Sequence, residues 1–131
     1  MGSLSITLIA IILIALLAIL ARLLPSKGAL GEMRLAHILK KLPEESYTVI
    51  NNLLIQNNGH TSQIDHIVIS VYGIFVIETK TYKGWIYGGE NSEYWTQNIY
   101  GNKYQLRNPI RQNYGHIKAL KNILNEYQDI P

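Results

Sequence analysis

Hydrophobic and polar positions divide this chain into two unlike parts. Residues 4–21 carry no charge and are almost entirely Ile, Leu and Ala, and two further leucines extend the run past Arg22. A membrane-spanning helix needs roughly 20 apolar residues, so this run is long enough to be one. The pattern predicts an N-terminal transmembrane helix over residues 1–24, a linker over 25–30 and a folded domain over 31–131.

Two other interpretations of the apolar run fit less well. A cleaved signal peptide normally starts with basic residues and ends at a small-residue cleavage site, and neither is present here. A buried helix that is apolar all round needs a large core to enclose it. The positive-inside rule predicts a single-pass protein of the cell membrane with a cytoplasmic domain. The basic residues that follow the run are Arg22, Lys27, Lys40 and Lys41.

Two segments of the domain have the spacing of amphipathic helices. The first runs from Gly31 to Leu42 and ends before Pro43, a residue that stops helices. The second opens at Pro109, which is favoured in a first turn, and runs to about Tyr127. The expected buried positions recur three or four residues apart. They are Leu35, Ile38, Leu39 and Leu42 in the first helix, and Ile110, Ile117, Leu120 and Leu124 in the second.

Between these helices lie β-branched and aromatic runs that are typical of strands. A first strand is expected over Tyr47–Ile55, followed by a hairpin whose strands flank residues 71–73. A further short pair is expected over Gly84–Gly88 and Tyr94–Tyr100. This order of elements predicts an α/β or α+β domain. Because the chain stops where another strand would begin, we expect the domain to continue beyond residue 131.

Charged residues stand at the end of the otherwise apolar hairpin: Asp65, Glu78 and Lys80. If residues 71–72 form the turn, Asp65 lies across from Glu78; if residues 72–73 form it, Asp65 lies across from Lys80. Either register puts the three on one sheet face, within roughly 5 to 8 Å at the backbone. Such a group is costly to bury unless it is paired or bound to metal. A solvated cross-strand Lys–Glu pair is the simpler alternative.

Composition narrows the chemistry. The chain has no cysteine, which excludes disulfides and thiolate sites. Its net charge of +3 is compatible with nucleic acid or an anionic membrane without requiring either. The spacing of His60, His66 and His116 is too loose to predict a zinc site, and His66 is expected on the strand face opposite Asp65.

The chain resembles the NERD (nuclease-related) domain family over about residues 28–124. The resemblance implies a restriction-endonuclease-like core, in which helices flank a central mixed β-sheet, related to the PD-(D/E)XK nucleases. It also implies DNA processing, and in many bacterial members a membrane segment precedes the domain, as here. The strings that carry it are Gly31-Glu32, Ser62-Gln63-Ile64-Asp65-His66, Tyr72 to Lys80, Gly84-Trp85-Ile86, Trp95 with Gln97, and Asn108 to Asn113 with His116.

Position by position, the resemblance makes Asp65 and Glu78 metal-binding carboxylates and Lys80 the catalytic lysine. Glu32 becomes a supplementary catalytic acid, although a first-turn acid that interacts with the helix dipole is a strong alternative. Mg²⁺ or Mn²⁺ is the implied cofactor, and the backbone carbonyl of Thr79 could add a further ligand. Supporting roles fall to residues of the second helix, for which capping and packing are the alternative: Gln112, Asn113 and His116.

Basic and aromatic residues elsewhere also have two interpretations. Lys83, Arg107 and Arg111 are candidate nucleic-acid contacts, although scattered basic residues are the default on a protein surface. Trp85, Trp95 and the many tyrosines could stack on single-stranded bases. Aromatic residues on strands more often pack against their neighbours, which is what we expect of most of these.

The sequence therefore predicts a membrane-anchored, Mg²⁺-dependent nuclease domain that hydrolyses DNA phosphodiester bonds. Its partners are nucleic acid and, through residues 4–24, the lipid bilayer. The alternative is a catalytically silent, membrane-tethered module that binds nucleic acid or protein on the same fold. Metal binding by Asp65 and Glu78 separates the two hypotheses. The oligomeric state does not follow from the sequence.

Overall fold

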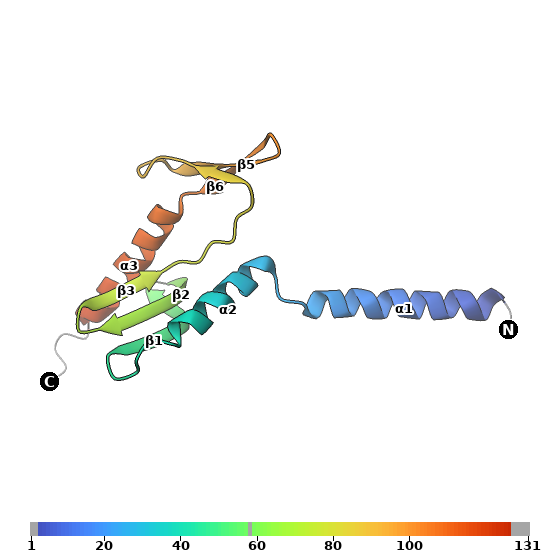
Figure 1. The fold of residues 1–131 in the computed structure, drawn as a ribbon, viewed down its shortest axis with the longest axis horizontal. Helices are drawn as coiled ribbons and strands as arrows, with labels where there is room; N and C mark the ends of the chain where they lie inside the picture. Colours follow the sequence, from blue (N-terminus) through green and yellow to red (C-terminus); the bar gives the residue numbers. More distant parts are fainter. Residues whose placement is uncertain (1–2, 58, 127–131) are drawn as a thin grey trace.

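The computed structural model describes residues 3–57 and 59–126, and Figure 1 shows how they are arranged. The described chain has an α+β fold, as expected, with helices on either side of one of two antiparallel sheets. In chain order, the elements are α1 (Ser3–Leu23), α2 (Lys27–Leu39), β1 (Tyr47–Asn57), β2 (His60–Ser70), β3 (Gly73–Ile77), β4 (Trp85–Tyr87), β5 (Tyr94–Ile99), β6 (Asn102–Arg107) and α3 (Pro109–Glu126).

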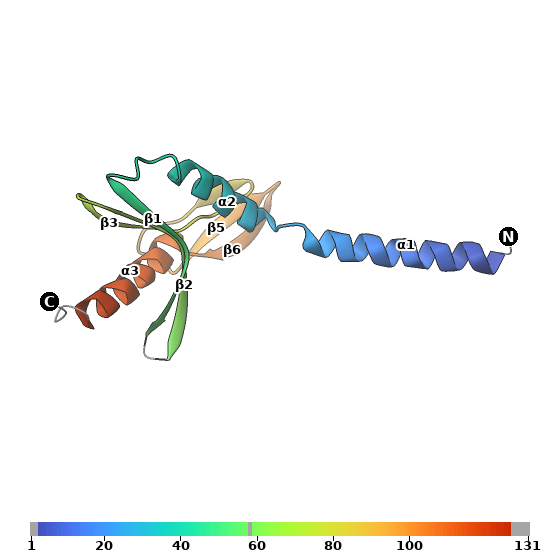
Figure 2. The same ribbon diagram turned by 90° about the horizontal axis from the view of Figure 1, so that it is seen from below.

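Helix α1 is apolar along its length and projects away from the rest of the chain (Figures 1 and 2). Its segment Ile6–Leu23 has a mean hydropathy of 2.9, and none of this segment is buried. By length and composition the helix could cross a membrane, a test that an N-terminal signal sequence also passes. Only Leu24, Pro25 and Ser26 separate α1 from α2.

The first sheet has the strand order β1–β2–β3 and contains the core of the domain. Helix α3 lies on one of its faces and α2 lies near the other, as the two views together show (Figures 1 and 2). The buried residues Ile55, Ile64 and Ile67 form the core cluster, and Leu120 and Ile123 of α3 pack against it. Because this core is small, polar contacts between elements matter to the stability of the domain.

The second sheet, β4–β5–β6, is a separate antiparallel unit. Tyr100 and Gly101 form the β5–β6 turn, and both have positive φ (50° and 88°), the backbone that a type I′ hairpin turn requires. At the other end of the sheet, the Trp95 indole N–H donates to the Gly89 carbonyl at 2.9 Å. A side chain on Gly88 would collide with the Trp95 ring, so this glycine allows the ring to reach the backbone.

The sheets differ in detail from the single mixed sheet that the resemblance implies. Within the described residues all strand pairs are antiparallel, because short connections join the neighbouring strands and return the chain in the opposite direction. The sequence pattern also does not predict β6 (Asn102–Arg107). This strand carries Lys103, Gln105 and Arg107 on one face, so it lacks an apolar signal there.

Helix α2 begins earlier and ends earlier than predicted. Ser26 caps its first turn, because the serine hydroxyl accepts a hydrogen bond from the Ala29 N–H at 3.2 Å. The helix ends at Leu39 instead of Leu42. Ile38, predicted to be buried, is 59% exposed, because only part of the apolar stripe reaches the sheet.

Helix α3 begins at Pro109, as predicted, and its predicted end at Tyr127 lies outside the described residues. Two of its predicted core positions are exposed: Ile110 is 46% exposed and Leu124 is 44% exposed. Both residues lie near the ends of the helix, whereas the contact with the sheet core involves Leu120 and Ile123.

Asn108 joins the second sheet to α3. Its side chain is fully buried, and its amide NH₂ group donates to the carbonyl oxygens of Glu90 and Ser92 at 2.8 and 2.7 Å. Its Oδ1 atom accepts from the Ile110 N–H at 2.9 Å and so caps the first turn of the helix. One buried amide therefore holds both the loop before β5 and the start of α3.

We predict that Asn108→Ala lowers the free energy of unfolding by about 2 kcal/mol, because it removes a helix cap and leaves buried carbonyls without their donor. Urea denaturation of the full chain in detergent micelles, followed by circular dichroism, measures this change. Asn91→Ala removes an exposed asparagine of the same loop and should change the stability by less than about 0.5 kcal/mol. Equal stability of Asn108→Ala and the wild type would show that Asn108 does not hold the loop and the helix together.

Candidate active site at the end of the β2–β3 hairpin

The register of the hairpin sets Asp65 beside Glu78. The observed pairing of β2 with β3 has Val71 and Tyr72 as its turn, which is the first of the two predicted registers. Continued by one residue beyond the paired positions, this register places Asp65 opposite Glu78. At that point the Thr79 N–H donates to Asp65 Oδ2 at 2.7 Å. Asp65 therefore holds the chain where it leaves β3.

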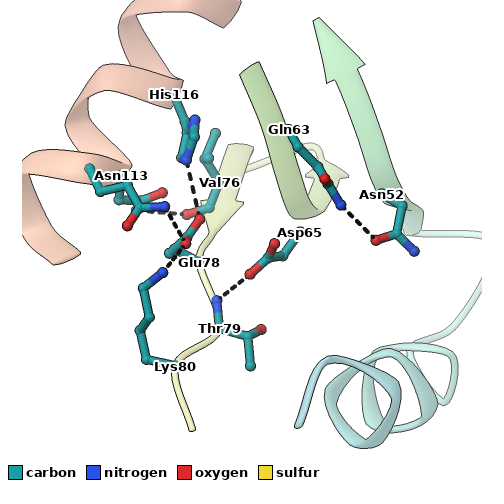
Figure 3. A network of polar contacts seen from close by, with 10 residues as sticks. Asn52, Gln63, Asp65, Val76, Glu78, Thr79, Lys80, Asn113 and His116 are labelled. Atoms are coloured by element: carbon teal, nitrogen blue, oxygen red, sulfur yellow. Dashed lines mark hydrogen bonds and ion pairs between the residues drawn. The ribbon is translucent and has the colours of Figure 1, made fainter. Parts of the chain in front are cut away.

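The carboxylate of Glu78 is the centre of a polar network (Figure 3). Its Oε1 atom accepts from Lys80 Nζ at 2.5 Å and from Gln112 Nε2 at 2.6 Å. Its Oε2 atom lies 3.2 Å from Nε2 of His116. The Glu78 side chain is only 7% exposed, whereas that of Lys80 is 29% exposed. The lysine thus reaches from solvent onto a carboxylate that is itself shielded from water.

Helix α3 supplies the other side of this network. Gln112 and His116 are one turn apart and both face Glu78. Between them, Asn113 donates from Nδ2 to the Val76 carbonyl oxygen at 3.1 Å, which fixes the helix to β3. The structure therefore brings together all three residues that the resemblance assigned to a supporting role.

The helix that carries Glu32 also approaches the site. A side chain on Gly31 would collide with Thr81 and contact Thr79, so this glycine allows α2 to lie against the chain just beyond β3. The α2 helix is the pale blue ribbon beside Thr79 in Figure 3. Glu32 itself is half-buried and forms no hydrogen bond or ion pair with the described residues. Its catalytic role stays a prediction.

The donors present fit a hard divalent cation. Mg²⁺ is commonly held by one or two carboxylates together with carbonyl oxygens and water. Asp65 and Glu78 supply two carboxylates side by side, and the Thr79 backbone lies between them. The described residues contain no cluster of three Asp, Glu, His or Cys side chains, so a carbonyl or water must complete the set. In this structure the positive charge beside the Glu78 carboxylate is the ammonium group of Lys80.

The candidate nucleic-acid contacts fall in two places. Arg107 and Arg111 line one surface cavity of about 510 Å³, which Glu90 and Glu93 also line. Lys83 lies apart from them, beside Lys27 at the start of α2. The proximity of the Lys83 side chain disfavours the charged form of Lys27 and so lowers its pKa.

Most aromatic side chains are not packed as we predicted from the sequence. Trp95 is half-buried and contacts Gly88, in agreement with the prediction. Trp85 is 79% exposed, and exposed tyrosines are present in the β2–β3 turn, on the second sheet and on α3. On the second sheet the prediction fails because, among the described residues, this sheet makes no extensive contact with another element.

The sequence analysis did not identify the hydrogen bonds of two buried polar residues, His66 and Asn108. His66 is buried on the face opposite Asp65, as expected, but its Nδ1 also lies 2.8 Å from Oδ1 of Asn51 on β1. Nothing in the sequence pairs these two residues. Asn108 did carry a signal, because an asparagine directly before a helix-opening proline is typical of a helix cap.

We predict that Asp65→Ala lowers the free energy of unfolding by about 1 to 3 kcal/mol, because the buried Thr79 N–H loses its acceptor. Asp65→Asn keeps an acceptor oxygen in the same place and should cost less. Urea denaturation of both variants in micelles measures the difference. If the two variants are equally stable, the Asp65–Thr79 hydrogen bond contributes nothing to the fold.

Comparisons with known proteins identify the family of this chain. A profile of the nuclease-related domain (NERD) family matches residues 27–131. An uncharacterized protein of Bacillus anthracis is 44% identical over 117 residues, which cover 88% of this chain and 55% of that relative. The chain thus spans about half the length of the curated relative that it matches. No solved structure matches the chain. The chain belongs to the nuclease-related (NERD) domain family.

Proposed function

We propose that this protein is a metal-dependent nuclease that hydrolyses DNA phosphodiester bonds. The observation that carries the proposal is the Asp65–Glu78 pair, with Lys80 bonded to the second carboxylate. Membership of a nuclease-related family supports the same conclusion. Phosphodiester cleavage requires charge neutralisation and an activated water, and these three side chains are suited to both tasks.

Each side chain has a distinct task in this mechanism. Asp65, Glu78 and the Thr79 carbonyl would hold Mg²⁺ or Mn²⁺, which when bound supplies positive charge and a more acidic water. Lys80, once released from Glu78, remains close enough to orient the attacking water or to stabilise charge that develops on the phosphate. Gln112 and His116 hold the Glu78 carboxylate in a fixed orientation.

The second candidate function is binding without catalysis. Lys80 and Gln112 already donate to Oε1 of Glu78 without a metal ion, and His116 Nε2 lies 3.2 Å from Oε2. A membrane-tethered module that keeps this network intact would bind nucleic acid or protein and leave it uncut. The two functions differ in whether a divalent cation displaces Lys80.

We also propose that α1 anchors the protein in the cell membrane with the domain on the cytoplasmic side. The length and apolar composition of α1 support this, together with its complete exposure. Arg22 and Lys27, which flank the end of the helix, favour the cytoplasmic orientation.

For the nuclease, we predict Mg²⁺- or Mn²⁺-dependent cleavage that falls at least about 100-fold in Lys80→Ala and in Asp65→Asn, since each removes a group that acts on the reacting phosphate or its cation. Labelled single- and double-stranded DNA and RNA, incubated with the full chain in micelles, provide the measurement. Lys41→Ala removes an exposed lysine at the end of α2 and should cleave like the wild type.

Cleavage that persists in both site variants would refute the assignment of these residues. The absence of cleavage by a folded protein, together with no detectable Mg²⁺ binding by calorimetry, would favour the silent binding module instead.

For the anchor, we predict that Leu13→Arg lowers the fraction of protein in washed membranes, because an arginine at the helix centre raises the insertion free energy by about 3 kcal/mol. Leu13→Ile keeps the apolar character and should remain in the membrane. Immunoblots of membrane and soluble fractions from bacterial cells report the partition. A mature protein that begins after α1 would instead identify the segment as a cleaved signal.

A further inference from the structure

The outer face of the second sheet concentrates exposed aromatic residues. The pairing of β4, β5 and β6 places Trp85, Tyr87 and Tyr94 on one face. These side chains are 79%, 46% and 51% exposed. Among the described residues, the second sheet makes no extensive contact with a helix or with the first sheet. We call it the aromatic face.

The opposite face of the same sheet is different. It carries Ile86, Trp95, Ile99 and Leu106, each of which is half-buried. The half-buried apolar side chains of the sheet therefore lie on this face, apart from the exposed aromatic residues of the other face. A contiguous group of exposed apolar side chains, unlike single exposed residues, often marks a binding surface.

The charge of the aromatic face is entirely positive. Lys103 and Arg107 lie on it, and none of its paired positions is acidic. Thr96, Asn98 and Gln105 lie between the rings and supply neutral hydrogen-bonding groups. Stacking rings, cations and amides together are what single-stranded nucleic acid requires of a protein surface. A surface that enters a bilayer would carry apolar residues instead of amides between its rings.

Both ends of the aromatic face continue into surface hollows that basic residues line. At one end, a groove of about 460 Å³ is lined by Lys83 together with Trp85 and Tyr100. At the other end, Arg107 and Arg111 line the cavity of about 510 Å³. Lys83 therefore lies near one end of this face, and Arg107 and Arg111 lie near the other.

The second hollow leads toward the candidate active site. Ile110 and Tyr114 line it, and they also line a shallower cavity of about 340 Å³ that includes Glu78. A strand that leaves the aromatic face at Arg107 can therefore follow the first turns of α3 to the carboxylate. Glu90 and Glu93 offset the two arginines in this hollow, so the binding free energy must come chiefly from the aromatic face.

We propose that the aromatic face binds single-stranded nucleic acid by stacking its bases and directs the strand along α3 to Glu78. This inference deepens the proposed nuclease function and rests on it for the fate of the strand, whereas the binding itself does not require cleavage. A duplex keeps its bases stacked on each other and cannot use the rings, so the substrate class is single-stranded.

Binding is measured with the full chain in micelles, in chelator so that no cleavage occurs. The probe is a fluorescein-labelled oligothymidylate of 15 nucleotides, and its binding is followed by fluorescence anisotropy. Binding of a labelled 15-base-pair duplex is measured in the same way for comparison. Trp85→Ala and Tyr94→Ala should each weaken binding of the single strand by roughly tenfold, the loss expected for one stacked base. Trp85→Phe keeps a ring and should retain most of the affinity.

Tyr104→Ala is the matched control, because Tyr104 is 52% exposed on the opposite face of the same sheet. It should bind like the wild type. Circular dichroism of every variant confirms that the exposed substitutions leave the fold intact. In the wild type, the exposed indole of Trp85 should also lose fluorescence when the oligonucleotide is added.

Unchanged binding in Trp85→Ala and Tyr94→Ala, or a duplex that binds as tightly as the single strand, would overturn the inference. It would also be overturned if Trp85→Ala weakened binding to phosphatidylglycerol vesicles and left oligonucleotide binding unchanged, since the face would then be a membrane contact. If binding follows the expected pattern but no metal supports cleavage, the proposed nuclease activity fails and the binding face stands. If all variants of the aromatic face cleave at equal rates, the proposed nuclease activity stands and the proposed role of the aromatic face fails.

Discussion

The shielded carboxylate of Glu78 is the group on which the arrangement of this domain depends. Removing a carboxylate from water costs several kcal/mol unless charges and hydrogen-bond donors replace the lost solvent. Here Lys80 and Gln112 donate to Oε1 of Glu78, and His116 lies 3.2 Å from Oε2. Gln112 and His116 both belong to α3, so the contacts around the carboxylate also hold the helix against the sheet. The small apolar core alone specifies this position less sharply.

The same contacts determine which group a metal ion would have to replace at Glu78. A divalent cation at Asp65 and Glu78 would meet an ammonium group already in place, so binding is an exchange of one positive charge for another. The Lys80 side chain is partly exposed, so it could move away from Glu78 into solvent. Gln112 and His116 belong to α3, which packs on the sheet, and both lie against Glu78. They would therefore keep the carboxylate in its orientation if a metal ion replaced Lys80.

The sequence alone predicted the fold class, the hairpin and the residues that meet at its end. Local periodicity sufficed for these features, because strand alternation brings Asp65 and Glu78 to one face in either register. It did not predict which helix positions are exposed, since Ile38, Ile110 and Leu124 have the correct spacing but lie beyond the contact with the sheet. Periodicity also does not indicate whether a sheet face is covered. For that reason Trp85 was expected to pack, although only the arrangement of whole elements decides its exposure.

The short connection between α1 and α2 limits where the domain can act. The residues between the two helices span at most about 10 Å when fully extended, and the Ser26 cap shortens this reach because it draws the last of them into the helix start. If α1 spans a bilayer, as proposed, the domain stays within the aqueous layer next to the lipid. Its binding to nucleic acid would then depend on the local concentration of strands at the membrane. Strands in the interior of the cell would be out of its reach.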